Sequence, residues 1–359
     1  MADDIIDFLR ETRDRNGSDL HLTVGAPPAT RVNGKLQPLG TEDLTAQRCK
    51  ELVYAVLTEA QRATLEDVWE LDFALQADSI GRFRGNAHFC RGNVEAAFRF
   101  IPEIIPDLED LGHGETVAGL CNKLQGLVLV TGMTGAGKTT TLAAMAKKIS
   151  QVRPCVMVSI EDPIEYVFDH SYGLVKQREL GTDTHSFPAA LKSALRQDPD
   201  VILVSEMRDL DTIRIAVTAA ETGHLVISTL HTIDAPKSLD RMIDVFPPEQ
   251  QPQIISQLSN CLIGIVSQRL LERADSPGRV MASEIMIPNY AIRSVIRDRK
   301  FEQILGLMQI GAHDGMHTID DSLAHLLVHG YISFGDAMTH CRDEEAITAR
   351  YQASRKKGK

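Results

Sequence analysis

The sequence lacks the features of a membrane-spanning, secreted or zinc-binding protein. No apolar run approaches the roughly 20 residues that cross a bilayer, and the N-terminal stretch MADDIIDFLRETRDRNGSD is too charged for a signal peptide. The cysteines are scattered and form no CxxC pair: Cys49, Cys90, Cys121, Cys155, Cys261 and Cys341. This spacing speaks against a zinc module or a disulfide framework and fits a reducing cytoplasm.

A basic surplus is also missing. The chain has 38 Lys and Arg against 49 Asp and Glu, a net charge of −11. A surface that coats nucleic acid would be basic, so we predict no nucleic-acid partner. The net charge does not exclude a local basic channel. The NKxD signal of guanine-specific proteins is absent too, which favours adenine.

One glycine-rich segment is highly informative. Residues 126–142 read GLVLVTGMTGAGKTTTL, an apolar strand, a loop that fits GxxxxGK[ST] and the start of a helix. In this pattern, loop N–H groups and the helix N-terminus bind phosphate, a lysine neutralises the β- and γ-phosphates and a hydroxyl ligates Mg²⁺. Lys138 and Thr139 have these last two roles. The expected ATP-binding residues are Gly132, Thr134, Gly135, Ala136, Gly137, Lys138, Thr139 and Thr140.

The 359 residues predict an α/β protein of two or three domains. Residues 1–100 indicate a small α+β domain with an Asn33-Gly34 hairpin, a helical stretch at 45–66 and strands within 80–100 turned at Gly81, Gly85 and Gly92. We place a linker at 101–113. Residues 114–270 alternate strands and helices, which favours a parallel sheet, and 271–359 reads as a helical region with a polar tail.

Acidic residues follow two further predicted strands. In IEDPIE, Glu161, Asp162 and Glu165 crowd one strand end, where a carboxylate can hold a Mg²⁺ water or take a proton from an attacking water. DPDVILVSEMRD is an apolar strand that ends in an acid. Its Glu206 stands at the Walker B position and would reach Mg²⁺ through water.

Histidines and arginines supply the remaining candidates. His224 and His231 bracket the strand LVISTL, and we expect them to approach the γ-phosphate or an acidic partner. Four arginines precede the linker and predict an electrostatic face: Arg82, Arg84, Arg91 and Arg99. An arginine that stabilises the leaving charge often comes from another subunit. Arg196 and Arg208, which flank the Walker B strand, are the alternatives.

The phosphate loop, the IEDPIE segment, the strand that ends at Glu206 and the strand between His224 and His231 occur in a particular order and spacing. Together they resemble the secretion ATPase superfamily of type II secretion, type IV pili and archaella. The segments GSDLHLTVGAPPATRVNGKL, AALKSALRQDPDVILVSEMRDLDTIR and RMIDVFPPEQQ look like PilT-type pilus retraction ATPases, and the resemblance runs from about residue 3 to about 345. It implies a homo-hexamer of subunits with a PAS-like N-terminal domain and a RecA-like ATPase domain. Such a motor would work in the cytoplasm at the inner-membrane base of the pilus machine. Mg-ATP hydrolysis would change the relative orientation of its domains, and this movement would turn or displace the membrane platform protein that holds the pilus base.

The same resemblance implies residue roles. Glu165 would be the water-activating base, supported by Glu161 and Asp162. Glu206 would be the Walker B acid, and Arg82, Arg84 and Arg99 would approach the phosphates. AIRSVIR, residues 291–297, resembles the AIRNLIR motif associated with retraction, with Arg293 and Arg297 facing outward.

Other functions remain open at this stage. The departure from AIRNLIR leaves room for an accessory retraction ATPase, which would work beside a second such motor. A ring that binds nucleotide and acts as a scaffold is an alternative of another class. An export or conjugation ATPase of the VirB11 type is a third, and the retraction-like segments and the acidic charge speak against it.

Overall fold

The computed structural model describes residues 4–32, 34–77, 80–101, 104–170 and 173–357, with side chains up to 354. It divides into two compact units. Unit 1 comprises Met1–Ile104 together with Pro163–Val167, and unit 2 comprises Ile105–Asp162 and Phe168–Lys359. The boundary at 104/105 lies inside the stretch that we predicted as a linker. No helix in the described part of the chain is long and apolar enough to cross a membrane.

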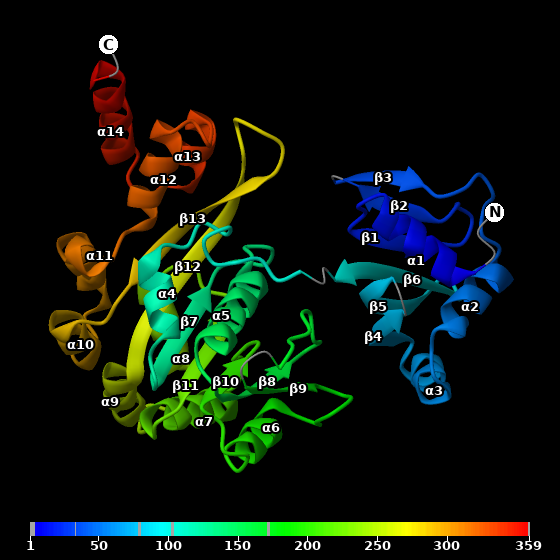
Figure 1. Cartoon of the computed structure of the whole chain (residues 1–359), viewed down its shortest axis with the longest axis horizontal. Helices are drawn as coiled ribbons and strands as arrows, with labels where there is room; N and C mark the ends of the chain where they lie inside the picture. The colour runs from blue at the N-terminus through cyan, green and yellow to red at the C-terminus, as the bar shows by residue number, and fades with distance from the viewer. Residues whose placement is uncertain (1–3, 33, 78–79, 102–103, 171–172, 358–359) are drawn as a thin grey trace. The chain divides into compact units, whose positions relative to one another are not determined.

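Unit 1 is an antiparallel sheet with three helices (Figure 1, blue to cyan). The strand order is β3-β2-β1-β6-β5-β4. Along β5, Phe83, Gly85 and Ala87 point into the core and alternate with half-buried residues, the pattern of a sheet with one covered face. The elements are α1 (Ile5–Asp14), β1 (Asp19–Leu22), β2 (Ala29–Val32), β3 (Lys35–Pro38), α2 (Ala46–Ala55), α3 (Glu59–Val68), β4 (Glu70–Ala77), β5 (Gly81–Cys90) and β6 (Asn93–Ile101).

Three local predictions for unit 1 need correction or comment. The helical stretch at 45–66 is two helices, because Thr58 and Gln61 form a capping box that starts α3. Gly85 does not turn the chain: it lies inside β5, where a Cβ would come within 2.4 Å of the Phe73 ring. In the predicted hairpin, Val32 pairs with Lys35 and Gly34 has φ +79°, whereas Asn33 lies outside the described residues.

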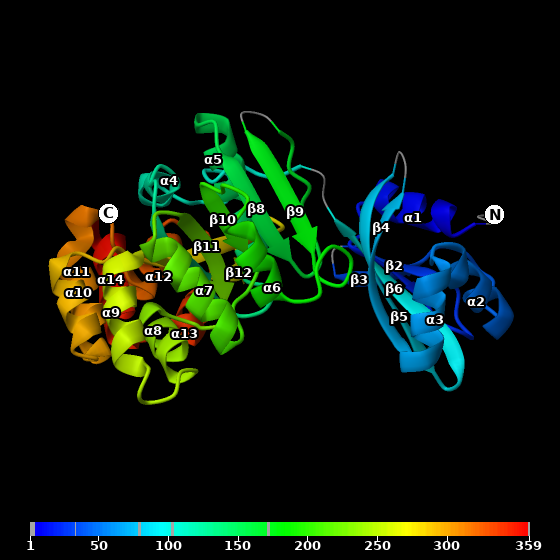
Figure 2. The ribbon, with the colours of Figure 1, turned by 90° about the horizontal axis from the view of Figure 1, so that it is seen from below.

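The sheet of unit 2 has the order β13-β12-β7-β11-β10-β8-β9, and among its described strands only β13 runs antiparallel to its neighbour (Figure 1). Figure 2 shows β12, β11, β10, β8 and β9 from another side. Alternate residues of β7 enter different cores. Val128 and Val130 pack with α4 and α5, while Leu127 and Leu129 pack with α6 to α9. Helices therefore cover both faces. The strands are β7 (Gly126–Thr131), β8 (Val156–Glu161), β9 (Leu174–Glu179), β10 (Val201–Val204), β11 (Leu225–Leu230), β12 (Leu262–Glu272) and β13 (Arg279–Met286), and the helices are α4 (Glu115–Cys121), α5 (Lys138–Val152), α6 (Phe187–Ala194), α7 (Leu210–Glu221), α8 (Ala235–Asp244) and α9 (Gln251–Cys261).

The region predicted as helical from residue 271 opens instead with β13. The sequence RVMASEIM contains Ala, Glu and two Met, which favour helix, but all eight residues pair with Ile265–Glu272 of β12. Pairing with a neighbouring strand thus overrides the helix propensity of these residues. The described residues after β13 are mostly helical, and Leu323 and Leu327 lie in a small core that also includes Leu271 and Ala282 of the two strands. These helices are α10 (Tyr290–Arg297), α11 (Ile304–Ile310), α12 (Ile319–Val328), α13 (Phe334–His340) and α14 (Glu344–Lys357).

Candidate nucleotide site

The candidate site lies along one edge of the unit 2 sheet, where parallel strands present their carboxyl ends. The register pairs Thr131 of β7 with Leu230 of β11, and Val204 of β10 with Ile160 of β8. The phosphate loop, His231 and Glu206 follow β7, β11 and β10, and Glu161 is the last residue of β8. They therefore line up in that order along the edge where ligands bind in open α/β sheets.

The loop between β7 and α5 depends on glycine at two positions. Gly132 has φ +151°, and a Cβ there would lie 2.5 Å from the Gln268 carbonyl oxygen and 2.9 Å from the Ala136 Cβ. Gly137, at φ +85°, is the N-cap of α5, and a Cβ there would lie 3.2 Å from Gln268 Nε2. The loop is thus pressed against β12 with its backbone in a conformation that only glycine adopts readily.

Lys138 and Gln268 hold the loop from inside. Lys138 is only 8% exposed, and its Nζ donates to the carbonyls of Gly132 at 2.9 Å and Met133 at 3.1 Å. The buried Nε2 of Gln268 donates to the Ala136 carbonyl at 2.7 Å. Sequence reasoning missed Gln268, because a single glutamine in an apolar strand belongs to no recognised motif.

Glu206 meets two of the predicted side chains. Its Oε1 lies 2.7 Å from Arg208 Nε, and its Oε2 lies 3.4 Å from His231 Nε2. Thr229 Oγ1 donates to the Ser205 carbonyl, and the Ser205 amide donates to the Ile160 carbonyl at 2.9 Å, so the backbone before Glu206 is held from both neighbouring strands. The structure therefore brings Glu206, Arg208 and His231 together.

The three acidic residues of the IEDPIE segment have different surroundings. Glu161 is 5% exposed, and its Oε1 accepts hydrogen bonds from Ser159 at 2.7 Å and Gln177 at 2.9 Å. These contacts make it a buried anchor of the strand end, while Asp162 is exposed. Glu165 is half-buried and belongs to the segment grouped with unit 1, whose Ile164 carbonyl accepts a hydrogen bond from Arg82 Nε at 3.2 Å. Its role as base therefore stays a prediction.

His224 lies at the other end of β11 from His231, so the two histidines do not approach the same γ-phosphate within one chain. His224 precedes β11, and its Nδ1 lies 3.0 Å from the Ala219 carbonyl at the end of α7. At the strand rise of 3.2–3.4 Å per residue, β11 separates the two histidines by about 20 Å. Arg196 also precedes its strand, β10, and lies at the edge away from Glu206. His224 and Arg196 thus precede their strands, whereas His231 and Glu206 follow theirs.

The arginines of unit 1 form a smaller group than predicted. Arg84 pairs with Arg99 across β5 and β6, and Arg82 is two residues from Arg84 on the same face. Arg91 lies in the turn at the other end of β5, outside this group. Arg99 donates to Asp19 at 2.9 Å. Burial opposes ionisation of Asp19, but hydrogen bonds from Ser18 and Arg99 outweigh it and lower the pKa of this carboxyl.

Arg293 also differs from the prediction. Its guanidinium donates to the carbonyls of Ser259, Asn260 and Leu262 at the end of α9, so this side chain closes a helix end and does not face outward. Arg297 is exposed, as predicted.

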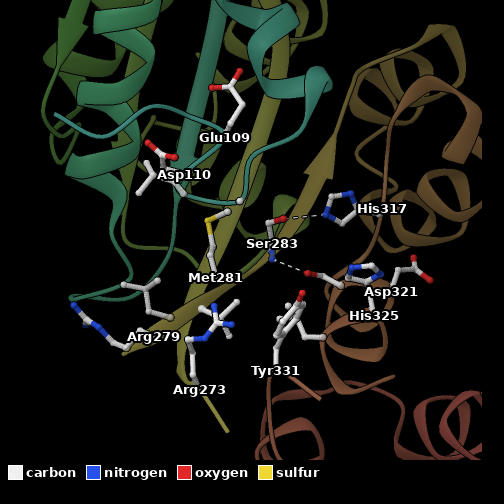
Figure 3. A pocket seen from close by; sticks show the side chains of 16 residues that line it. Glu109, Asp110, Arg273, Arg279, Met281, Ser283, His317, Asp321, His325 and Tyr331 are labelled. Carbon is white, nitrogen blue, oxygen red and sulfur yellow. Dashed lines mark hydrogen bonds between the residues drawn. The ribbon is translucent and has the colours of Figure 1, made fainter. Parts of the chain in front are cut away.

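A pocket of about 560 Å³ lies beside the phosphate loop (Figure 3). We call it the strap pocket, because residues 109–112 of the segment that leads to α4 line one side of it. Leu270 of β12 connects the two, since its Cδ1 would lie 3.4 Å from a Cβ on Gly137. Figure 3 shows Met281 in the middle, between Asp110 on one side and Tyr331 on the other. The lining residues are Glu109, Asp110, Leu111, Gly112, Leu270, Arg273, Arg279, Val280, Met281, Ser283, His317, Asp321, Ser322, His325, Leu326 and Tyr331.

The lining combines apolar and polar groups. Leu270, Met281 and Leu326 are apolar, Ser283 Oγ lies 3.0 Å from His317 Nε2, and the Arg273 guanidinium lies 5.0 Å from the centre of the Tyr331 ring. Burial lowers the pKa of His317, so this imidazole is neutral at neutral pH. Such a pocket suits a flat heteroaromatic group that carries hydrogen-bonding edges.

Known proteins match nearly the whole chain. Residues 105–314 match the family model "Type II/IV secretion system protein". The type IV pilus retraction ATPase PilT of Pseudomonas aeruginosa is 44% identical over 92% of this chain and 96% of its own length. The type IV pilus ATPase PilU of the same species is 39% identical over 93% and 87%. The crystal structure of a PilT retraction motor with bound ADP superposes with a TM-score of 0.90 at 44% identity, over 96% of this chain and 99% of that one.

These matches confirm the predicted fold class, an N-terminal PAS-like domain followed by a RecA-like ATPase domain, and the predicted activity. A family model that covers more than half of the chain and relatives that align from end to end agree with the phosphate loop and the acidic strand ends described above. The chain therefore belongs to the type II/IV secretion ATPase family, as a PilT-like P-loop ATPase.

Proposed function

We propose that this chain is a motor that hydrolyses ATP to retract type IV pili. The observation that carries the proposal is the phosphate loop, with Lys138 held at its centre and Glu206 and His231 on neighbouring strand ends. The end-to-end similarity to PilT supports retraction in particular. We also propose that the motor is a homo-hexamer in the cytoplasm at the inner-membrane base of the pilus machine, where it acts on a platform protein.

The loop residues fit a triphosphate. Lys138 brings an ammonium group among loop carbonyls, and the residues after it start a helix whose N-terminus favours anions. The ATP-binding residues are those from Gly132 to Thr140 named above. The strap pocket, which Leu270 joins to Gly137, has the size and lining for the adenine and ribose.

The strand-end carboxylates fit Mg²⁺. Thr139 and Glu206 would hold it, the hydroxyl directly and the carboxylate through water. When bound, Mg²⁺ would neutralise charge on the β- and γ-phosphates. His231 and Arg208 orient the Glu206 carboxylate from two sides.

Hydrolysis also needs a base and a positive charge near the phosphates. We assign the base to Glu165, with Glu161 as the buried anchor of the IEDPIE segment and Asp162 beside it. We assign the charge to Arg82, Arg84 and Arg99, which share one face of the unit 1 sheet. In a closed ring, these arginines would come from a neighbouring subunit.

The test is ATPase activity and mass of the purified protein with Mg-ATP, beside Lys138→Ala and Glu165→Gln. We expect a ring of about six subunits. We also expect turnover to be lost in both variants, with nucleotide binding kept in Glu165→Gln. A wild-type ring that binds ATP without turnover would refute the motor and favour a scaffold. Turnover without retraction in cells that lack their own retraction ATPase would favour an accessory role beside a second motor, as the similarity to PilU allows.

A further inference from the structure

A short strap fastens onto the helix that follows the phosphate loop. It comprises residues 105–113, which lead from the unit boundary to α4. Lys147 of α5 donates to the Ile105 carbonyl at 2.7 Å and lies 3.0 Å from Asp107, and Lys148 lies 3.7 Å from Glu109. The side chains of Asp107 and Glu109 are largely exposed, so these two ion pairs contribute little to holding the strap.

His113, at the end of the strap, makes a different kind of contact. It is 4% exposed, and its Nε2 lies 3.0 Å from Oγ1 of Thr141, which is 1% exposed. Thr141 is three residues after Lys138, on the first turn of α5. The backbone amide of His113 donates to the Leu108 carbonyl at 2.9 Å, so the strap is closed on itself at the same point. A buried bond thus joins the strap to the turn that carries the phosphate-binding lysine.

Burying the His113 imidazole at this position lowers the stability of the folded protein. Its Nδ1 is buried and has no hydrogen-bond partner in the described part of the chain. A buried polar atom without a partner costs stability, and an apolar side chain of similar size would avoid this cost. The bond to Thr141 is therefore the feature that distinguishes histidine from an apolar residue here.

The bond also fixes one wall of the strap pocket. Asp110 and Gly112 line the pocket, and a Cβ on Gly112 would lie 3.9 Å from Cε of Met281, which occupies the middle of the pocket. We propose that His113 is a positioning residue for nucleotide: its bond to Thr141 holds the strap wall in register with the P-loop helix, so that one nucleotide meets the pocket and the phosphate loop together. This inference rests on the proposed nucleotide site.

The test compares His113→Leu, Thr141→Val and the double variant in the full-length protein. Calorimetry with ADP gives the dissociation constant, and steady-state assays with Mg-ATP give kcat and KM. We expect each single variant to weaken ADP binding about three- to tenfold and to raise KM, with kcat within about twofold. The double variant should be no worse than the more damaging single one, because all three lack the same bond.

Two controls separate positioning from general damage. Thr141→Ser keeps the hydroxyl and should bind ADP as the wild type does. Ser150→Ala removes another mostly buried hydroxyl of α5, which bonds to the Lys147 carbonyl at 2.9 Å, and should also bind normally. Affinities within twofold of wild type in both single variants, additive losses in the double variant, or an equal loss in Ser150→Ala would each overturn the proposal. A wild-type protein that binds no ADP would instead refute the nucleotide site itself.

Discussion

Acid should destabilise unit 2 through His113, and the size of this effect follows from its burial. Burial, with a smaller contribution from the nearby His317, lowers the pKa of His113 from 6.5 to about 4. The folded protein therefore keeps this imidazole neutral at pH values where the unfolded chain binds a proton. Stability is unaffected above about pH 6.5, falls as the pH drops through the window between the two pKa values and is fully reduced below about pH 4.

The magnitude follows from the width of that window. Each unit of pKa difference corresponds to about 1.4 kcal/mol, so the complete loss is about 3 kcal/mol and the loss at pH 5 is about 2 kcal/mol. Other groups titrate in the same range, including His317, whose pKa burial also lowers. A comparison with His113→Leu removes their shared contribution, because that variant lacks only this imidazole.

The assay is urea unfolding of both proteins at pH 7.5 and pH 5. Circular dichroism follows unit 2, which contains most of the helices. The single tryptophan, Trp69, lies in unit 1, so its fluorescence gives an internal control that should not change between the two proteins. We expect the stability of His113→Leu relative to wild type to improve by about 2 kcal/mol on going from pH 7.5 to pH 5. Parallel pH dependences, or a variant that loses more stability in acid than the wild type does, would refute the reasoning.

Three further predictions follow from other contacts. Gly132→Ala places a Cβ 2.5 Å from the Gln268 carbonyl oxygen, so we expect a lower melting temperature and weaker ADP binding, and an unchanged protein by both measures would contradict this. Gly85→Ala meets the Phe73 ring at 2.4 Å and should lower the urea midpoint of Trp69 fluorescence, while ADP affinity serves as the measurement that stays constant. Arg342 lies 2.6 Å from Glu284, which is 1% exposed, and 3.3 Å from Asp234, so Arg342→Met should destabilise unit 2 by about 3 kcal/mol in urea. Arg342→Lys should recover part of this loss, and equal stability of the two variants would argue against an unpaired buried charge.

Sequence patterns predicted the parts of the fold whose determinants are local. The buried runs LVLVT, VILV and LVISTL became β7, β10 and β11, because a strand covered on both faces needs continuous apolar residues. The phosphate loop was predictable because its glycines, lysine and hydroxyls stand at fixed spacing. By contrast, β13 was misread as helical, since its residues favour a strand only when β12 lies beside them.

The misplacement of His224 has a simple physical origin. Motif reasoning places residues by their order in the chain, but the two ends of a strand lie at opposite edges of a sheet. His224 and His231 are close in sequence and have the same side chain, yet only His231 follows β11 to the edge where Glu206 and the phosphate loop lie. Conversely, Gln268 and His113 belong to neither motif, yet one buried hydrogen bond joins Gln268 to Ala136 of the loop and another joins His113 to Thr141 on the first turn of α5. Residues that support a site in this way carry no spacing signal, because strand pairing and packing, and not the motif itself, bring them there.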